Sequence, residues 1–147
     1  KQCNLSGIVD LQQRIPRHIA LRMQRESHVL LLLNWNDPDE SGIYTGKVFE
    51  YLAAQRPILA LGEPGGVVEA LLSQTGVGEH VASLDKLKVL LRSWYQEYQN
   101  TGCVIYRGDW NLIQKYTHRE MARHFAELLN DVSLCRNKRC SGATETA

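Results

Sequence analysis

Lys47 and Glu50 are the two residues whose types and spacing most clearly suggest chemistry. The pattern around them predicts a helix that begins near Thr45. On such a helix Gly46, Lys47 and Glu50 share one face, which looks back toward the N-terminus. A helix N-terminus offers free backbone N–H donors and a positive dipole end to phosphate oxygens. The sequence therefore predicts a diphosphate-binding site around residues 42–50.

The two side chains suit different parts of a nucleotide. A carboxylate accepts two hydrogen bonds in a planar fork, so Glu50 suits the two hydroxyls of a ribose. Lys47 carries a mobile point charge that suits phosphate oxygens. The alternative is an ordinary surface ion pair between Lys47 and Glu50, worth about a few tenths of a kcal/mol. The spacing alone leaves both interpretations open.

The elements around this helix predict a parallel sheet that positions the site. Residues 28–33 are almost entirely apolar, which is typical of a strand covered on both faces by helices. Residues 57–61 form a second such strand. Polar loops follow at 34–41 and 62–66, at the carboxyl ends of the strands, where α/β sheets bind ligands. Trp35 in the first loop either stacks on a base or sugar or anchors the loop.

The rest of the chain supplies further helices and short strands with recognisable ends. Gly76 suits a left-handed helix cap, Ser83 suits an N-cap, and Thr117 with Glu120 forms a capping-box pattern. The predicted strands lie at 9–13 and 79–82, and the predicted helices at 19–26, 44–55, 67–74, 83–99 and 117–129.

The last helix carries an apolar stripe that is either core or a seam between domains. The stripe consists of Met121, Phe125, Leu128 and Leu129. Residues 134–147, rich in basic and small polar side chains, are predicted to be a disordered tail.

The region from Arg17 to Gly78 resembles the donor-binding C-terminal half of a GT-B fold glycosyltransferase. The similarity is greatest to the retaining, family 4-like group (glycosyltransferase group 1 type). It is carried by residues 20–33, by residues 75–78, and above all by the core Gly46-Lys47-Val48-Phe49-Glu50-Tyr51-Leu52-Ala53. The resemblance implies an α/β, Rossmann-like parallel sheet flanked by helices.

The resemblance also implies roles for individual residues. The helix N-terminus would bind the diphosphate of a sugar nucleotide, and Glu50 would hold the ribose hydroxyls. Lys47 falls on a position near the phosphates, where it would stabilise the leaving diphosphate. The expected substrate-binding residues are Tyr44, Thr45, Gly46, Lys47 and Glu50.

One position departs from the family pattern. Many members carry a second acidic residue near the donor sugar, and the corresponding position here is Gly42. The nearest acidic residues are Asp37, Asp39 and Glu40, so the carboxylate that would contact the sugar stays unassigned. Related sequences with a similar core also lack this first acid, so the resemblance stands.

The resemblance predicts that residues 1–133 are part of a donor-binding domain truncated at its N-terminus. Residues 1–4 look like the end of a helix, and two further βα units would precede residue 9. The expected partners are a nucleotide-sugar donor, the missing N-terminal acceptor domain and, through an exposed sheet edge, a second copy of the chain.

Composition narrows the other possibilities. The 147 residues are 44% hydrophobic and carry a net charge of +1, so an ordinary single domain is expected and a broad nucleic-acid-binding field is not. The four cysteines and five histidines show no metal-binding spacing, so neither a metal nor another cofactor is expected. No Walker loop, dinucleotide fingerprint or membrane-spanning run occurs. The expected location is the cytoplasm, with any membrane association peripheral, at the inner surface.

The functional expectation is the donor-binding part of a transferase. It would move a sugar from a nucleotide-diphosphate sugar to an acceptor in glycan or polysaccharide synthesis, and it would be inactive alone. Two alternatives remain open: a sugar-nucleotide epimerase of the same fold, and a catalytically silent nucleotide-binding or assembly module.

Overall fold

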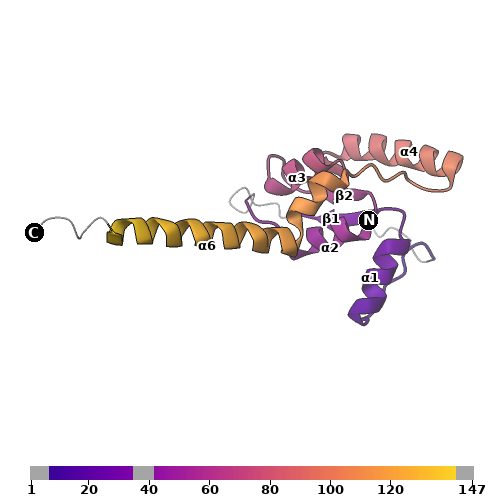
Figure 1. Ribbon diagram of the computed structural model, residues 1–147. Coiled ribbons are helices and arrows are strands. Elements are labelled where there is room, and N and C mark those ends of the chain that lie inside the picture. Colours follow the sequence, from indigo (N-terminus) through magenta and orange to yellow (C-terminus); the bar gives the residue numbers. More distant parts are fainter. Residues whose placement is uncertain (1–6, 35–41, 142–147) are drawn as a thin grey trace, which may run out of the picture.

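The chain folds into an α/β structure built on a three-stranded parallel sheet. The computed structural model describes residues 7–34 and 42–141, with side chains described up to residue 133. The strands are β1 (Leu30–Leu33), β2 (Ile58–Leu61) and β3 (Gly78–Val81), in the order β1-β2-β3. Leu30 lies opposite Ile58, and Ile58 lies opposite Gly78. This arrangement is consistent with the predicted Rossmann-like class (Figure 1).

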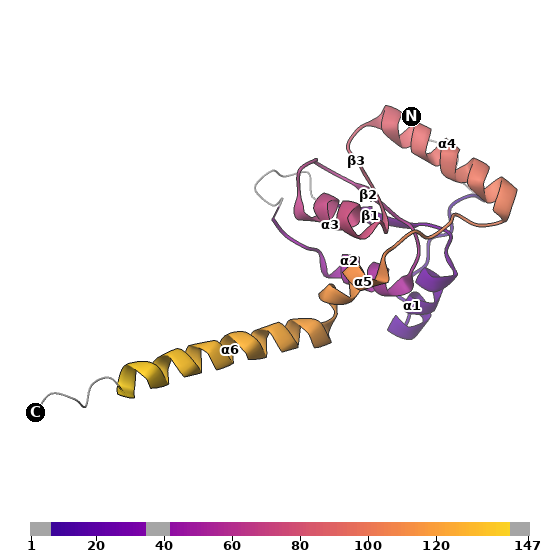
Figure 2. The same cartoon turned by 45° about the horizontal axis from the view of Figure 1, so that its top comes forward.

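Helices cover the sheet unequally. They are α1 (Arg17–Glu26), α2 (Gly46–Ala54), α3 (Val67–Thr75), α4 (Leu84–Thr101), α5 (Trp110–Ile113) and α6 (His118–Ser141), with the 3-10 turn η2 (Gln114–Tyr116) between the last two. The core joins α2, α3 and α5 to one face of the sheet through Val48, Leu52, Leu71, Leu72 and Ile113. Figure 2 shows α4 on the opposite side from α1 and α2.

β1 is covered on one face only, which corrects the prediction for residues 28–33. Leu30 and Leu32 are buried, whereas Leu31 and Leu33 are 51% and 69% exposed. The apolar run does not indicate two covered faces here, because β1 is an edge strand. The helix α4 packs against β3, at the other edge of the sheet. The central strand β2 is the one buried on both faces, at Ile58, Leu59 and Ala60.

The predicted strand at 9–13 is absent, which is a second correction. Residues 8–13 have no regular structure, and Ile8 and Leu11 are highly exposed. A strand needs a neighbour to take its backbone hydrogen bonds, and no described strand lies beside this segment. The predicted helix end at 1–4 falls outside the described residues, as does all of the predicted loop beyond Asn34 and before Gly42.

The local end signals are confirmed in most cases. Gly76 adopts φ 67° and donates its N–H to the carbonyl of Leu72. The Ser83 side chain accepts from the N–H of Lys86 at the start of α4. At Thr117 only half of the capping box forms: its hydroxyl accepts from the N–H of Glu120 at 3.3 Å, while the Glu120 carboxylate turns to Arg123.

The last helix is longer than predicted. α6 runs to Ser141, past the expected end at 129 and through 134–141, which we predicted to be disordered. No proline or glycine interrupts residues 118–141, so the backbone has no breaker before Gly142. The helix projects away from the body of the molecule in both Figure 1 and Figure 2. Its apolar stripe is exposed, so the stripe is not part of this chain's core.

Candidate functional site

The helix that the sequence predicts to begin near Thr45 is α2. The helix begins at Gly46 with Thr45 as its N-cap, and the Thr45 side chain makes no capping hydrogen bond. Its hydroxyl oxygen is buried without a partner in the described structure. Among the described residues, the backbone N–H groups of Gly46 and Lys47 also have no partner. These are orphan donors of the kind that a helix N-terminus can offer to an anion.

Space exists around this helix start. A Cβ atom placed on Gly46 or on Gly42 would meet no heavy atom within 4 Å. No described side chain therefore fills the space next to the Cα of Gly46, whereas Val48 in the same turn is fully buried in the core.

Glu50 is already held by several donors, four residues into the helix. Lys47 Nζ lies 3.1 Å from Glu50 Oε2, so the predicted surface ion pair is present. Arg17 lies 3.3 Å from Oε1, and Gln24 Nε2 donates to Oε2 at 3.5 Å. The Glu50 side chain is 28% exposed. The hydrogen bond from Lys47 lowers the pKa of Glu50, against a smaller raising effect of burial.

The sequence analysis missed the two residues that α1 contributes. Arg17 and Gln24, together with Leu21, follow helical spacing on one face of α1. That spacing places the three residues on one face of α1. It did not show that their neighbour is Glu50, because the packing of α1 against α2 is a contact between residues distant in sequence.

A cavity of about 530 Å³ lies beside Glu50, between the helices α1 and α2 and the C-terminal segment. Both Gly46 and Glu50 line it, together with Arg17 and Arg25 from α1. The C-terminal segment closes the other side with apolar and aromatic side chains from α5, η2 and the start of α6, which are Trp110, Ile113, Tyr116 and Met121. The cavity thus combines a few charged groups from α1 and α2 with a mostly apolar lining, to which Leu21, Phe49, Leu52 and Ala53 also contribute.

Tyr44, Thr45 and Lys47 lie beside this cavity and do not line it. The Tyr44 ring packs on Phe49 with ring centroids 5.7 Å apart, and Phe49 is part of the cavity wall. Burial raises the pKa of Tyr44, and the nearby Tyr116 adds to the rise. The structure therefore brings Gly46 and Glu50 together at the cavity and places the other three expected residues around it.

The second loop at the carboxyl edge has its own polar cluster. Glu69, in the first turn of α3, accepts a hydrogen bond from the N–H of Gly65. His80 Nδ1 lies 3.8 Å from the same carboxylate, and its Nε2 is buried without a partner in the described structure. This cluster lies on α3 and β3 and does not reach the α2 cavity.

Trp35, Asp37, Asp39 and Glu40 lie outside the described residues, so the group that would contact a donor sugar is unplaced.

Within the described part of the chain, no three His, Cys, Asp or Glu side chains are grouped so that they could hold a metal ion. No helix in that part has both the length and the apolar character to cross a lipid bilayer.

Comparisons of the chain with protein-family models, with curated proteins and with solved structures find no match.

Proposed function

We propose that this chain is the donor-binding half of a GT-B fold, retaining glycosyltransferase that binds a nucleotide-diphosphate sugar. One observation carries the proposal: Glu50 and the open first turn of α2 line the same cavity. A carboxylate one turn away from unpaired helix N–H groups would let one ligand place its diphosphate at the helix N-terminus and its ribose hydroxyls at Glu50.

The cavity has properties that suit such a ligand. Its volume of about 530 Å³ falls within the range of about 300–1,000 Å³ that is typical of small-molecule sites. Arg17 and Arg25 line the cavity and Lys47 lies beside it, so positive charge is present for a diphosphate. Trp110 and Tyr116 supply flat apolar surface, which suits a base or a sugar ring.

The proposed mechanism is electrostatic. As the bond between the sugar and the diphosphate breaks, negative charge grows on the leaving group. The N–H groups of Gly46 and Lys47 and the Lys47 ammonium would stabilise that charge. Lys47 would exchange its contact with Glu50 for a phosphate oxygen, which would free the carboxylate for the ribose hydroxyls. An acceptor-binding domain would be needed for turnover, so this chain alone should bind nucleotide weakly and transfer nothing.

A silent module that keeps the fold is the second candidate, and one observation favours it. Lys47, Arg17 and Gln24 already occupy the Glu50 carboxylate, as expected of a structural ion-pair cluster. In that case the cavity would have no need to accept a ribose. Epimerase and transferase activities would be separated by product analysis on a polypeptide that includes the acceptor-binding domain.

Isothermal titration calorimetry with UDP, GDP and ADP tests the proposal. We expect one of the three to bind, and its 2′-deoxy form to bind at least about tenfold more weakly, because a hydrogen bond to a charged group contributes about 1.5–3 kcal/mol. Glu50→Gln should weaken the ribonucleotide and abolish the preference over the deoxy form. Glu79→Gln is the matched control, since Glu79 lies exposed on β3 and should change neither affinity.

Two outcomes of this titration would contradict the proposal. Binding that Glu50→Gln leaves unchanged would contradict the assigned role of Glu50. Absence of binding by all three nucleotides would overturn the transferase proposal in favour of the silent module.

A further inference from the structure

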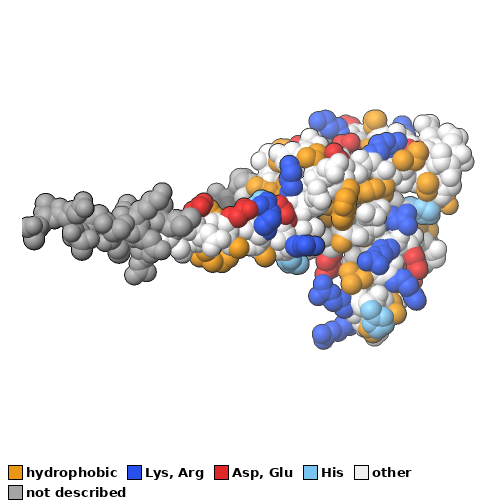
Figure 3. All heavy atoms as spheres, viewed as in Figure 1, with side chains coloured by type: hydrophobic (Ala, Val, Ile, Leu, Met, Phe, Trp, Pro, Cys, Tyr) orange, Lys and Arg blue, Asp and Glu red, His pale blue; other side chains and the backbone are white. Residues whose placement is uncertain are grey.

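α6 carries an exposed apolar seam with the spacing of a coiled coil. Met121, Phe125, Leu128 and Val132 follow one another at intervals of four, three and four residues, the alternation of a and d positions in a heptad. Leu129 flanks them. All five side chains are between 48% and 67% exposed. Figure 3 shows apolar atoms gathered along the lower side of the projecting helix, with charged atoms above them.

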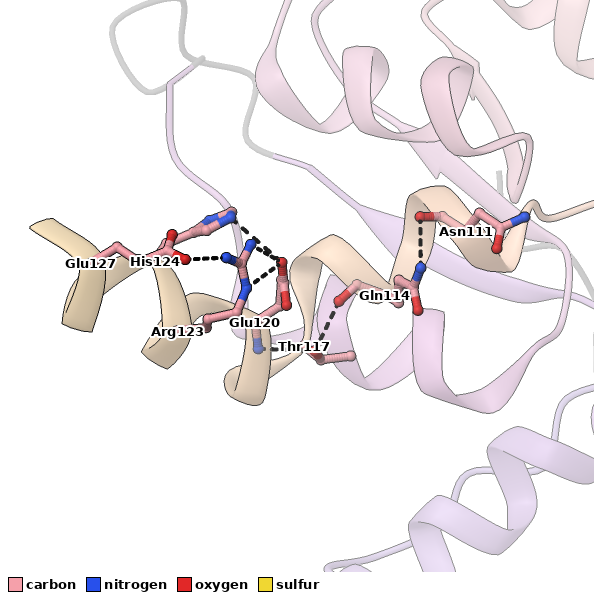
Figure 4. Close-up of polar contacts among 7 residues, drawn as sticks. All are labelled: Asn111, Gln114, Thr117, Glu120, Arg123, His124 and Glu127. Atoms are coloured by element: carbon pink, nitrogen blue, oxygen red, sulfur yellow. Dashed lines mark hydrogen bonds and ion pairs between the residues drawn. The ribbon is translucent and has the colours of Figure 1, made fainter.

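The opposite side of α6 is already satisfied by contacts within the helix. Arg123 pairs with both Glu120 and Glu127 on that side, and His124, which lies on the flank between the two sides, has its Nε2 3.5 Å from Glu120 (Figure 4). Pairs at these spacings stabilise a helix on its own. The polar side therefore needs no partner, whereas the apolar seam leaves large side chains in water.

The charges near the seam favour a protein partner over a lipid surface. Between residues 118 and 133 the helix carries Arg119 and Arg123 against Glu120, Glu127 and Asp131. Helices that lie on membranes usually present a polar face rich in lysine and arginine. The segment that carries the seam lacks that excess of positive charge, while Arg136, Lys138 and Arg139 follow nearer the C-terminal end of the helix.

We propose that the seam pairs with the same seam of a second copy of the chain, with the two helices antiparallel. In this register Phe125 of each copy lies opposite Leu128 of the other, and Met121 lies opposite Val132. Each layer is apolar on both sides, and the symmetric contact closes on itself as a dimer.

The flanking charges select the antiparallel arrangement. His124 and Asp131 lie on the same flank of the seam, at the g positions of the heptad. Antiparallel pairing places His124 of each copy beside Asp131 of the other, so the complementary pair forms twice. Parallel pairing would place His124 beside Leu129, so the second copy would add no acidic side chain to the contact that His124 makes with Glu120 in its own helix.

The area is sufficient for a specific but reversible contact. Covering five large side chains that are half to two-thirds exposed buries roughly 500 Å² per copy, or about 1,000 Å² in total, which is near the lower limit for a biological interface. We therefore expect a dimer whose population depends strongly on protein concentration.

Sedimentation equilibrium over concentrations from about 1 µM to about 1 mM tests the proposal, since an interface of this size should dissociate within that range. Leu128→Lys should weaken dimerisation at least about tenfold, because it buries an unpaired charge. It should leave the fold intact, since Leu128 is exposed in the single chain. The matched control is Asn130→Lys, which adds the same charge on the other side of α6 and should leave dimerisation unchanged.

A charge-swap pair tests the orientation. Asp131→Lys alone should weaken the dimer, and adding His124→Glu should restore it, because antiparallel helices would place the new Glu and Lys together. Failure of the second substitution to restore the dimer would exclude the antiparallel register.

Two other results would overturn the proposal. One is a protein that stays monomeric over the whole concentration range. The other is equal weakening by Leu128→Lys and Asn130→Lys. Flotation with anionic phosphatidylserine vesicles that Leu128→Lys abolishes, together with a monomer in solution, would assign the seam to a membrane. None of these readouts depends on nucleotide binding, so they fail or succeed independently of the proposed function.

Discussion

Glu50 illustrates how one carboxylate can have a structural and a binding role in the same fold. Its three donors come from two helices, so the carboxylate fixes α1 against α2 in the absence of any ligand. The same donors are cations and amides that could instead meet phosphate oxygens. An exchange of partners on binding would therefore cost little charge pairing, although it would loosen the contact between the helices.

The lowered pKa of Glu50 predicts a pH-dependent stability. Because the ionised carboxylate is favoured in the folded state, the stabilisation is fully present above the ordinary pKa of 4.5 and is lost as pH falls through the lower folded value. The free energy of unfolding should therefore drop more steeply below pH 4.5 in the wild type than in Glu50→Gln. Urea unfolding at a series of pH values measures the difference. Glu79→Gln should keep the wild-type slope, and equal slopes in all three proteins would refute the prediction.

Gly78 should tolerate no side chain. A Cβ atom there would lie 1.9 Å from the backbone oxygen of Ile58, so β2 and β3 would have to separate. We expect Gly78→Ala to cost about 3 kcal/mol, the upper end for overpacking a well-packed interior. Gly46→Ala is the control, since the added carbon meets open space and the helix favours alanine. Thermal unfolding followed by circular dichroism compares them, and a Gly78→Ala protein as stable as the control would contradict the register of the sheet.

At the scale of elements, the sequence predicts what is encoded locally. The glycine at 76 and the serine at 83 act through hydrogen bonds to residues three or four positions away, so their patterns could be read without the fold. The burial of β1 could not be read in this way. It depends on which helix covers each face, and an apolar run looks the same on an edge strand as on a central one. The end of α6 differs from the prediction because a polar composition is as compatible with an exposed helix as with disorder, and no glycine or proline breaks residues 118–141.

Gln55 gives a prediction at the end of α2. It is a non-glycine residue in the left-handed region, with φ 55°, where its side chain is strained. Gln55→Gly should raise the free energy of unfolding by roughly 0.5–1 kcal/mol, because glycine adopts this conformation without steric cost. Ser27→Gly is the control at the end of α1, where φ is −74° and glycine should destabilise the protein. Chemical denaturation measures the free energy of unfolding of both variants. Destabilisation by Gln55→Gly would contradict the left-handed conformation of Gln55.

At the scale of the whole molecule, the open face of β1 is another exposed apolar surface, formed by Leu31 and Leu33. The N–H groups of Leu30 and Asn34 bond to β2, so the backbone groups of Leu31 and Leu33 point to the free edge of the sheet. Tyr51 donates to the carbonyl of Leu31 and covers part of that edge. The predicted association through a sheet edge would use what remains.

Substitution on this face separates association from folding. Leu33→Lys should change the free energy of unfolding by less than about 0.5 kcal/mol, since the side chain is exposed, and it should raise the solubility limit by placing a charge on the edge. Leu32→Ala, one residue away but buried, should cost about 2–5 kcal/mol. Light scattering at high concentration and thermal unfolding measure the two effects. Equal destabilisation by both variants would show that β1 is covered on both faces after all.

The candidate site was predictable to the extent that it lies on one helix. Thr45, Gly46, Lys47 and Glu50 could be placed relative to one another from helical geometry alone, and the structure keeps that arrangement. The far wall could not be predicted, because Trp110 and Tyr116 reach the cavity only through the path of the chain after α4. Nothing in the spacing of those aromatics connects them to residue 50.

Met121 belongs both to the cavity wall and to the seam of α6. A ligand in the cavity and a second copy docked on the seam would both contact the thioether of Met121. If either event shifts that side chain, thermodynamic linkage requires each to alter the affinity of the other by an equal factor. Met121, near the N-terminal end of α6, would thus couple ligand binding in the cavity to dimerisation through the seam.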